Sequence, residues 1–248
     1  MITKVELEKL VKEYETEDFI KDDPVRFPNR FTEKKDIEIA GFIASLVAYG
    51  RRDVFIKKLN TLFELAQNEP LNFIMNFEPQ ILGDFNYRFG KPDDFAQIFS
   101  IMRTLYEKDG GLEELFKYGY ETKPKGNMFI PVTDYFYARA KENSGQGFYF
   151  MIPDPKKGGA MKRMCMYLRW MVRKGPVDFG IWDFMPASEL LIPLDVHVAR
   201  ISREMGLLTR NANDFKAVLE LTENLKKFDS ADPAKYDFAM FGYGVNEK

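Results

Sequence analysis

The chain has 248 residues, with one cysteine, one histidine and 36 basic residues against 38 acidic residues. Its length and its hydrophobic content of 45% predict a folded chain with a sizeable core, as one large domain or two modest ones. One cysteine excludes an intrachain disulfide, a cysteine-ligated iron–sulfur cluster and a zinc finger, and one histidine excludes sites with several imidazoles. We therefore expect no metal and no cofactor.

The beginning of the chain does not resemble a targeting segment. Residues 1–10 (MITKVELEKL) are charged and lack the apolar core of a signal peptide. No apolar run approaches the length needed to cross a bilayer. We therefore expect a soluble, cytoplasmic protein. The net charge of −2 gives no overall indication of nucleic acid, although a near-neutral total can conceal a local basic patch.

Apolar residues recur at helical spacing along most of the chain. The best strand candidate, residues 148–152 (FYFMI), is short, and two-residue alternation is otherwise scarce. The pattern therefore predicts an all-α fold. The predicted helices cover residues 37–48, 55–66, 95–105, 161–172 and 198–205, and Gly206 is expected to end the last of them.

Loops rich in proline and glycine separate these helices without forming a long linker. Residues 122–127 (TKPKGN) and 143–147 (NSGQG) are two such loops, and they place a possible boundary between lobes near 120–147. No internal repeat is visible. We predict one compact helical unit over residues 1–248, which could be divided into two lobes at this boundary.

Positive charge is concentrated in residues 151–175. This segment has seven basic residues and one acidic residue, a net charge of +6. On the helix predicted within it, Lys162, Arg169 and Arg173 share one face by their spacing. That face is either a solvated side of an amphipathic helix or a surface that attracts phosphates.

The turn before this helix favours the second alternative. Gly158 and Gly159 lead directly into the helix start, where backbone N–H groups suit a phosphate. Lys157 and Arg163 lie on either side of the helix start and would add the salt-dependent attraction typical of nucleic-acid binding. Gly158, Gly159, Lys157, Arg163, Arg169 and Arg173 are therefore the candidate residues for contacts to nucleic acid.

Asp195 stands immediately before another predicted helix. An aspartate is favoured there because its carboxylate accepts the exposed N–H groups of the first turn. Helix capping is one explanation of Asp195, and a carboxylate that takes part in a reaction is the other. His197, two positions later, is expected to be a hydrogen-bonded structural residue, because the chain has no second histidine to share a metal.

Two short motifs resemble the helix-hairpin-helix DNA glycosylases. Residues 193–198 (PLDVHV) are similar to the aspartate motif of that superfamily, in which the aspartate opens a helix that faces the damaged nucleotide. Residues 158–162 (GGAMK) are similar to its glycine hairpin, which ends in a catalytic lysine, although the usual Gly-x-Gly-x-Lys becomes Gly-Gly-x-x-Lys. The 33 positions from Lys162 to Asp195 resemble the archaeal 8-oxoguanine glycosylase branch more than the bacterial endonuclease branch.

Most of the chain also resembles a bacterial family of uncharacterised proteins. The resemblance is carried by residues 169–173 (RWMVR), by residues 193–197 (PLDVH) and by residues 232–239 (DPAKYDFA). Within the last of these motifs, we interpret Asp232 and Asp237 as a capped helix start and not as a pair of catalytic carboxylates.

The glycosylase resemblance implies a fold of two helical lobes with the site in a groove between them. It also implies a DNA base-excision glycosylase/lyase that acts on an oxidised purine such as 8-oxoguanine. Lys162 would attack deoxyribose C1′ as a neutral amine, and Asp195 would stabilise the developing positive charge. The candidate walls of a base pocket are Tyr167, Trp170, Phe179 and Trp182, each of which is otherwise a core residue.

Two alternatives remain open for the function. The first is a nucleic-acid-binding protein of the same fold that has lost base excision. The second is a helical interaction protein, in which Lys162 and Asp195 serve only as surface charge and N-cap. For the glycosylase and for the nucleic-acid-binding protein, the expected partner is DNA, as a damaged duplex or a single strand.

Overall fold

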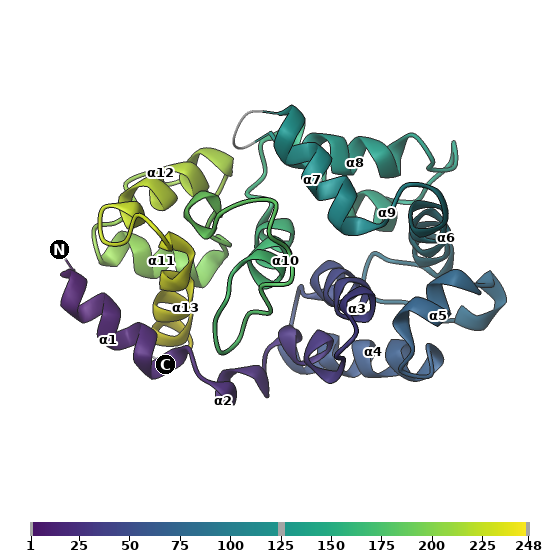
Figure 1. Cartoon of the computed structure of the whole chain (residues 1–248), viewed down its shortest axis with the longest axis horizontal. Helices are drawn as coiled ribbons and strands as arrows, with labels where there is room; N and C mark the ends of the chain where they lie inside the picture. The colour runs from purple at the N-terminus through teal and green to yellow at the C-terminus, as the bar shows by residue number, and fades with distance from the viewer. Residues whose placement is uncertain (1, 124–126, 247–248) are drawn as a thin grey trace. The chain divides into compact units, whose positions relative to one another are not determined.

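A computed structural model describes residues 2–123 and 127–246, and these residues are predominantly helical (Figure 1). The described residues contain no β-strand, and their extended pairings are isolated bridges. The prediction of an all-α fold is therefore confirmed. The loop expected at 122–127 falls partly outside the described residues, which omit 124–126.

The chain divides into two compact units, one of which draws on both ends of the sequence. Unit 1 combines Met1–Asp23 with Lys156–Lys248, and unit 2 comprises Pro24–Pro155. The region 120–147, where the sequence suggests a boundary between lobes, lies within unit 2.

Unit 2 consists of helices that bury a largely aromatic and aliphatic core. Helix α7 packs against α8, where Gly119 permits the approach because a Cβ at that position would collide with the carbonyl of Met128. Helix α5 contacts both α3 and α6. The helices are α3 (Lys34–Val47), α4 (Arg52–Leu65), α5 (Pro70–Met75), α6 (Pro92–Lys108), α7 (Leu112–Thr122), α8 (Phe129–Tyr137) and α9 (Gln146–Met151), with 3₁₀ turns η1 (Pro24–Arg26), η2 (Pro28–Arg30) and η3 (Pro79–Leu82).

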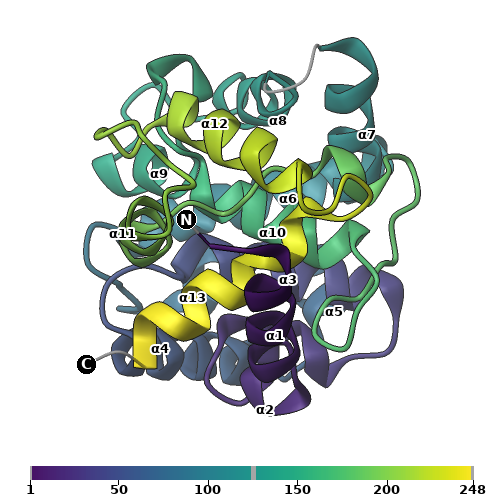
Figure 2. The ribbon, with the colours of Figure 1, turned by 90° about the vertical axis from the view of Figure 1, so that its left-hand side faces the viewer.

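Unit 1 is formed around the last helix of the chain. Helix α13 packs against α1 and α11, so the first and last helices lie side by side (Figure 2). The fully buried Leu7 of α1 and Phe238 of α13 belong to the core of the unit. Its elements are α1 (Lys4–Tyr14), α2 (Glu17–Ile20), α10 (Lys162–Val172), α11 (Val196–Glu204), α12 (Phe215–Lys226) and α13 (Tyr236–Asn246), with 3₁₀ turns η4 (Pro155–Lys157, which begins in unit 2), η5 (Ala187–Glu189) and η6 (Pro233–Lys235).

The helices predicted from apolar spacing are confirmed, and they correspond to α3, α4, α6, α10 and α11. Gly206 ends α11 as expected: it has a φ of 75°, and the N–H of Leu207 bonds back to the carbonyl of Ser202. The strand prediction at 148–152 is wrong, because these residues lie mostly in helix α9. A short apolar run has no decisive period, and the buried Phe148 and Met151 are spaced i, i+3 on a helix.

No helix within the described residues combines the length and the apolar character that a membrane-spanning helix requires.

Candidate active site

Lys162 and Asp195 lie close together in unit 1. The Nζ atom of Lys162 is 3.9 Å from Oδ2 of Asp195, and both side chains are partly exposed, at 28% and 19%. The residues come from the starts of two helices, α10 and α11. The two residues that the sequence selects for catalysis therefore form an ion pair that solvent can reach.

The backbone of Asp195 explains why this side chain is fixed. Asp195 is the N-cap of α11, and its Oδ1 accepts hydrogen bonds of 2.9 Å from the N–H groups of His197 and Val198. The predicted capping role is therefore confirmed. Because Oδ1 bonds to the helix, Oδ2 is the oxygen that faces Lys162.

The start of α10, next to the glycine turn, has no side-chain cap. Met161, the residue before the helix, has a φ of 53°, and its side chain has no oxygen with which to cap the first turn. Gly158 has a φ of 74°, and a Cβ placed on Gly158 or on Gly159 would meet nothing within 4 Å. The turn is therefore open on its outer side, as the approach of a large anion requires.

The beginning of α12 fixes the inner side of this turn. The N–H of Phe215 donates to the carbonyl of Gly158 at 2.9 Å, and Gly159 pairs with Asp214 in an isolated bridge. Asp214 caps α12 through Ala217 and forms an ion pair with Arg210. This support cannot be predicted from local sequence patterns, because it joins residues more than 50 positions apart.

The predicted basic surface is smaller than the sequence suggests. Lys157 is exposed and Arg163 is half-buried. In contrast, Arg169 is 2% exposed and Arg173 is 4% exposed. Both guanidinium groups are buried among carboxylates. They therefore belong neither to a solvated helix face nor to a surface that binds phosphates. Spacing on α10 places them on one face correctly, but it does not identify the partner that covers that face.

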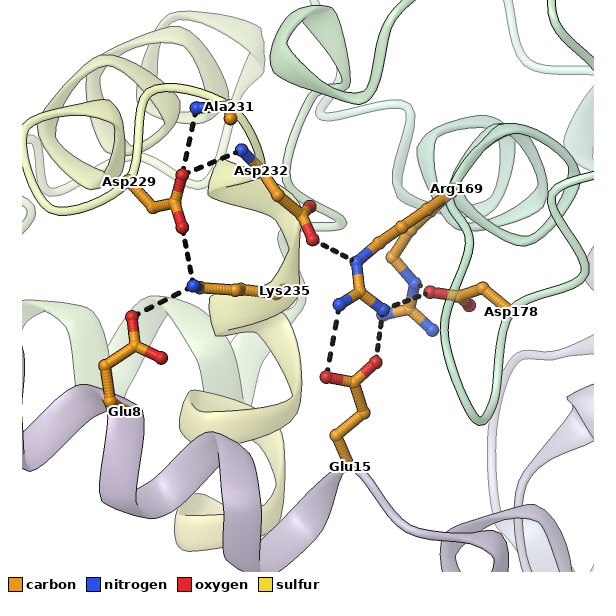
Figure 3. Close-up of polar contacts among 9 residues, drawn as sticks. Glu8, Glu15, Arg169, Asp178, Asp229, Ala231, Asp232 and Lys235 are labelled. Carbon is orange, nitrogen blue, oxygen red and sulfur yellow. Dashed lines mark hydrogen bonds and ion pairs between the residues drawn. The ribbon is translucent and has the colours of Figure 1, made fainter.

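The carboxylates that bind these arginines come from separate segments of unit 1, and Figure 3 shows three of them, Glu15, Asp178 and Asp232. Arg169 donates to Asp178 at 3.2 Å and to Asp237. Arg173 donates to Asp178 at 2.9 Å, to Asp232 at 2.8 Å and to both oxygens of Glu15. The cluster links the end of α1 and the start of α13 to α10.

Asp237, in the first turn of α13, is the residue of this cluster most relevant to the site. Its carboxyl is buried, and burial raises its pKa to about 7. Arg169 and Lys162 oppose that increase in the pKa, whereas Asp195 adds to it. The charges of Lys162 and Asp195 therefore both influence the pKa of Asp237.

Asp232 and Asp237 do mark helix starts, since Asp232 is the N-cap residue of η6 and Asp237 lies in the first turn of α13, but neither carboxylate acts as the expected cap. In the described residues, the carboxylate of Asp232 caps no N–H group of η6 and instead binds Arg173. The carboxylate of Asp237 binds Arg169. The available signal was that α10 contains arginines and no acidic residue of its own, since buried guanidinium groups require carboxylate partners.

The proposed aromatic walls are mostly core residues. Tyr167 and Trp170 are fully buried, Trp182 is 2% exposed, and Phe179 is half-buried. The rings of Tyr167 and Trp182 pack edge to face with their centroids 5.4 Å apart. In this conformation only Phe179 has the exposure that contact with a ligand requires.

Within the described residues, no group of three or more His, Cys, Asp or Glu side chains is arranged to hold a metal ion. The carboxylates of the arginine cluster bind guanidinium groups, as described above.

Comparison with known proteins gives a match to a family model. Neither the curated proteins nor the solved structures match the chain. A family model described as "Protein of unknown function (DUF2400)" matches residues 23–246, a range that contains Lys162, Asp195 and Asp237 but not α1. The expected membership of an uncharacterised family is confirmed: the chain belongs to the DUF2400 family.

Proposed function

We propose that this protein is a DNA base-excision glycosylase/lyase of the helix-hairpin-helix type, acting on an oxidised purine such as 8-oxoguanine. The observation that carries the proposal is the distance of 3.9 Å between Lys162 Nζ and Asp195 Oδ2. A lysine and a carboxylate at the starts of two helices are the groups that this chemistry needs, and both are reached by solvent.

The pair divides the reaction between its two members. The neutral amine of Lys162 forms a bond to C1′ while the bond from C1′ to the base breaks, and the base leaves with one of the two amine protons. The ring bond from C1′ to O4′ then breaks, O4′ takes up the second proton, and a Schiff base is left between Nζ and C1′. The carboxylate of Asp195 stabilises the positive charge that develops on the sugar. Its Oδ1, which accepts hydrogen bonds from the N–H groups of His197 and Val198, keeps the carboxylate in place.

The open glycine turn supports a role in holding DNA. The outer side of Gly158 and Gly159 is open next to the start of α10, and Lys157 adds an exposed positive charge beside this turn. A phosphate at this point would lie at the same helix start as Lys162. One helix would thereby position the nucleotide and supply the nucleophile.

Trapping with borohydride tests the proposal directly. A duplex containing 8-oxoguanine is incubated with the protein and sodium borohydride, which reduces a Schiff base to a stable protein–DNA adduct. We expect an adduct with the wild type and with Lys174→Gln, an exposed lysine at the other end of α10. We expect none with Lys162→Gln. Equal trapping by Lys162→Gln, or no adduct with the wild type on a panel of lesions, would contradict the proposal.

One observation favours a second candidate, a nucleic-acid-binding protein without base excision. Tyr167, Trp170 and Trp182 are buried, and a flipped base needs an aromatic or apolar wall. DNA binding that weakens steeply with salt, with no base released from any lesion, would support this second function over the first.

A further inference from the structure

The turn that precedes α6 holds an arginine at a position that favours glycine. Tyr87 and Gly90 exchange both of their backbone hydrogen bonds, at 2.9 and 2.8 Å, so Arg88 and Phe89 form the tip of a two-residue turn. Arg88 has a φ of 51°, in the left-handed region where residues with a Cβ are strained. Arg88 is exposed, and Phe89 is 41% exposed. The strained backbone therefore presents a cation and an aromatic ring to solvent.

Contacts within unit 2 hold this turn in place. The hydroxyl of Tyr49 donates to the carbonyl of Tyr87 at 3.1 Å, and the hydroxyl of Tyr87 donates to the carbonyl of Tyr49. At the start of α9, Gly147 permits a close approach, because a Cβ there would collide with the carbonyl of Phe89. The tip of the turn is therefore fixed by neighbours on both of its sides in the sequence.

Rings from two further segments extend the surface of the tip. The ring of Phe150, on α9, has its centroid 4.9 Å from that of Phe89 and 4.7 Å from that of Tyr49. The guanidinium carbon of Arg88 is 5.9 Å from the centroid of Tyr49 and 5.8 Å from that of Phe89. Tyr49 and Phe150 are half-buried. We call Tyr49, Arg88, Phe89 and Phe150 the turn patch.

The charge of Arg88 is not neutralised from within. Among the residues that the structure describes, its guanidinium lies near rings and forms no ion pair. A Cβ on Gly50 would lie 2.6 Å from its Nη1, so the side chain lies close to the backbone of that glycine. Arg139 of the same unit shows the alternative, because it covers the ring of Tyr135 at 3.6 Å and also pairs with Asp109. The charge of Arg88 is therefore available to an external anion.

We propose that the turn patch is a binding site for single-stranded nucleic acid. An unpaired base stacks on an exposed aromatic ring or on a guanidinium plane, and every base offers such a face. The phosphate beside that base is attracted by the charge of Arg88. In a duplex the faces of the bases are covered by their neighbours, so stacking on Phe89 selects unpaired strands. The site belongs to unit 2 and requires no chemistry at Lys162.

Fluorescence anisotropy with labelled single strands tests the proposal. The probes are oligonucleotides of dT and of U with about 12 nucleotides, because DNA and RNA share the stacking faces and the phosphates that the site would contact. We expect the wild type to bind them, and to bind more weakly as salt is added. Binding of either probe supports the site, and the tighter one shows which strand it prefers. No binding of either probe would overturn the proposal and leave a protein partner to account for the patch.

Arg88→Gly separates binding from folding. Glycine adopts a φ of 51° without strain, which offsets the greater freedom of the unfolded chain, so we expect the thermal midpoint of unfolding to change little. The affinity should fall about tenfold, and the slope of log K against log salt concentration should decrease by about 0.7, the value for one phosphate contact on a single strand. Phe89→Ala, at an exposed position, should also weaken binding about tenfold but leave this slope unchanged.

Arg139→Gln is the matched control. It removes an exposed arginine of the same unit that also lies over a ring but is paired with Asp109, so we expect unchanged binding. Unchanged binding in either Arg88→Gly or Phe89→Ala, or an equal loss in Arg139→Gln, would overturn the proposal. None of these measurements uses a lesion or borohydride. Single-strand binding through the turn patch without a borohydride adduct would therefore refute the glycosylase function and leave the turn patch established.

Discussion

Asp195 binds helix α11 with one carboxylate oxygen and faces Lys162 with the other. Oδ1 accepts the N–H groups of His197 and Val198 at 2.9 Å, and Oδ2 lies 3.9 Å from Lys162 Nζ. The sequence alone left capping and chemistry as alternatives for this residue. The geometry makes them compatible, because each uses a different oxygen, and it also makes them separable by mutation.

Asp195→Asn separates the two roles. Asparagine caps a helix nearly as well as aspartate, so we expect the free energy of unfolding to change by less than about 0.5 kcal/mol. The amide carries no negative charge, and we expect borohydride trapping on 8-oxoguanine duplex to be lost. Urea unfolding and the yield of adduct, measured on the same preparation, check both parts.

Asp195→Ala is the companion variant, because it removes the cap as well as the charge. It should cost about 1 kcal/mol of stability beyond the asparagine variant. If Asp195→Asn retains full trapping, the carboxylate has no part in the reaction and only its capping role remains.

The buried arginine cluster gives the second prediction. Arg173→Met would leave Glu15, Asp178 and Asp232 without their shared cation in a buried site. Removal of one partner from a buried ion pair typically costs about 3–5 kcal/mol, and we expect a loss of at least that order here. The free energy of unfolding in urea measures it.

The adjacent residue supplies the control for this prediction. Lys174→Met removes the same charge from an exposed position next to Arg173 and should change stability by less than about 0.5 kcal/mol. Similar stabilities for the two variants would contradict the assignment of Arg173 to a structural cluster.

The helices could be predicted from the sequence because their evidence is local. Apolar spacing identified α10 and α11, and residue type identified Asp195 as a cap and Gly206 as a stop. The same local evidence failed at 148–152, where a run of apolar residues fits a strand and a short helix equally well.

The surroundings of the site could not be predicted, because they depend on contacts between distant segments. Glu15 and Asp237 reach α10 from opposite ends of the chain. Helical spacing placed Arg169 and Arg173 on one face but did not show that carboxylates cover it. The position of Lys162 opposite Asp195 was expected only through the resemblance to a known superfamily, and no feature of spacing alone implies it.

The exposed charge beside the glycine turn leads to the third prediction. If Lys157 contacts a DNA phosphate, Lys157→Gln should weaken binding to all sequences alike. It should also reduce the slope of log K against log salt concentration by about one, since one counterion fewer is released. Fluorescence anisotropy with a labelled duplex at several salt concentrations measures this slope.

Lys227→Gln is the matched control for Lys157→Gln. Lys227 is an exposed lysine of the same unit at the far end of α12, the helix whose first residues hold the glycine turn. Because α12 has 12 residues, the two ends are about 18 Å apart. An equal change of slope in both variants would show that the binding surface is not centred on the turn.

The fourth prediction concerns the pH dependence of stability. The pKa of Asp237 is raised from an ordinary value of 3.8 to about 7 in the folded protein, chiefly by burial. Between about pH 4 and pH 7 the folded protein therefore keeps a proton that the unfolded chain has released. Over this range, the contribution of Asp237 to the stability of the wild type falls as the pH rises.

Asp237→Asn lacks this proton equilibrium. The difference in free energy of unfolding, variant minus wild type, should therefore rise between about pH 4 and pH 7, by at most about 1.4 kcal/mol per pH unit, and level off above pH 7. Asp214→Asn should show the opposite direction. The hydrogen bond from Arg210 lowers the pKa of Asp214 to about 2, so its stabilising contribution is lost as the pH falls from about 4. A flat or falling difference for Asp237→Asn would show that its carboxyl is ionised throughout this range.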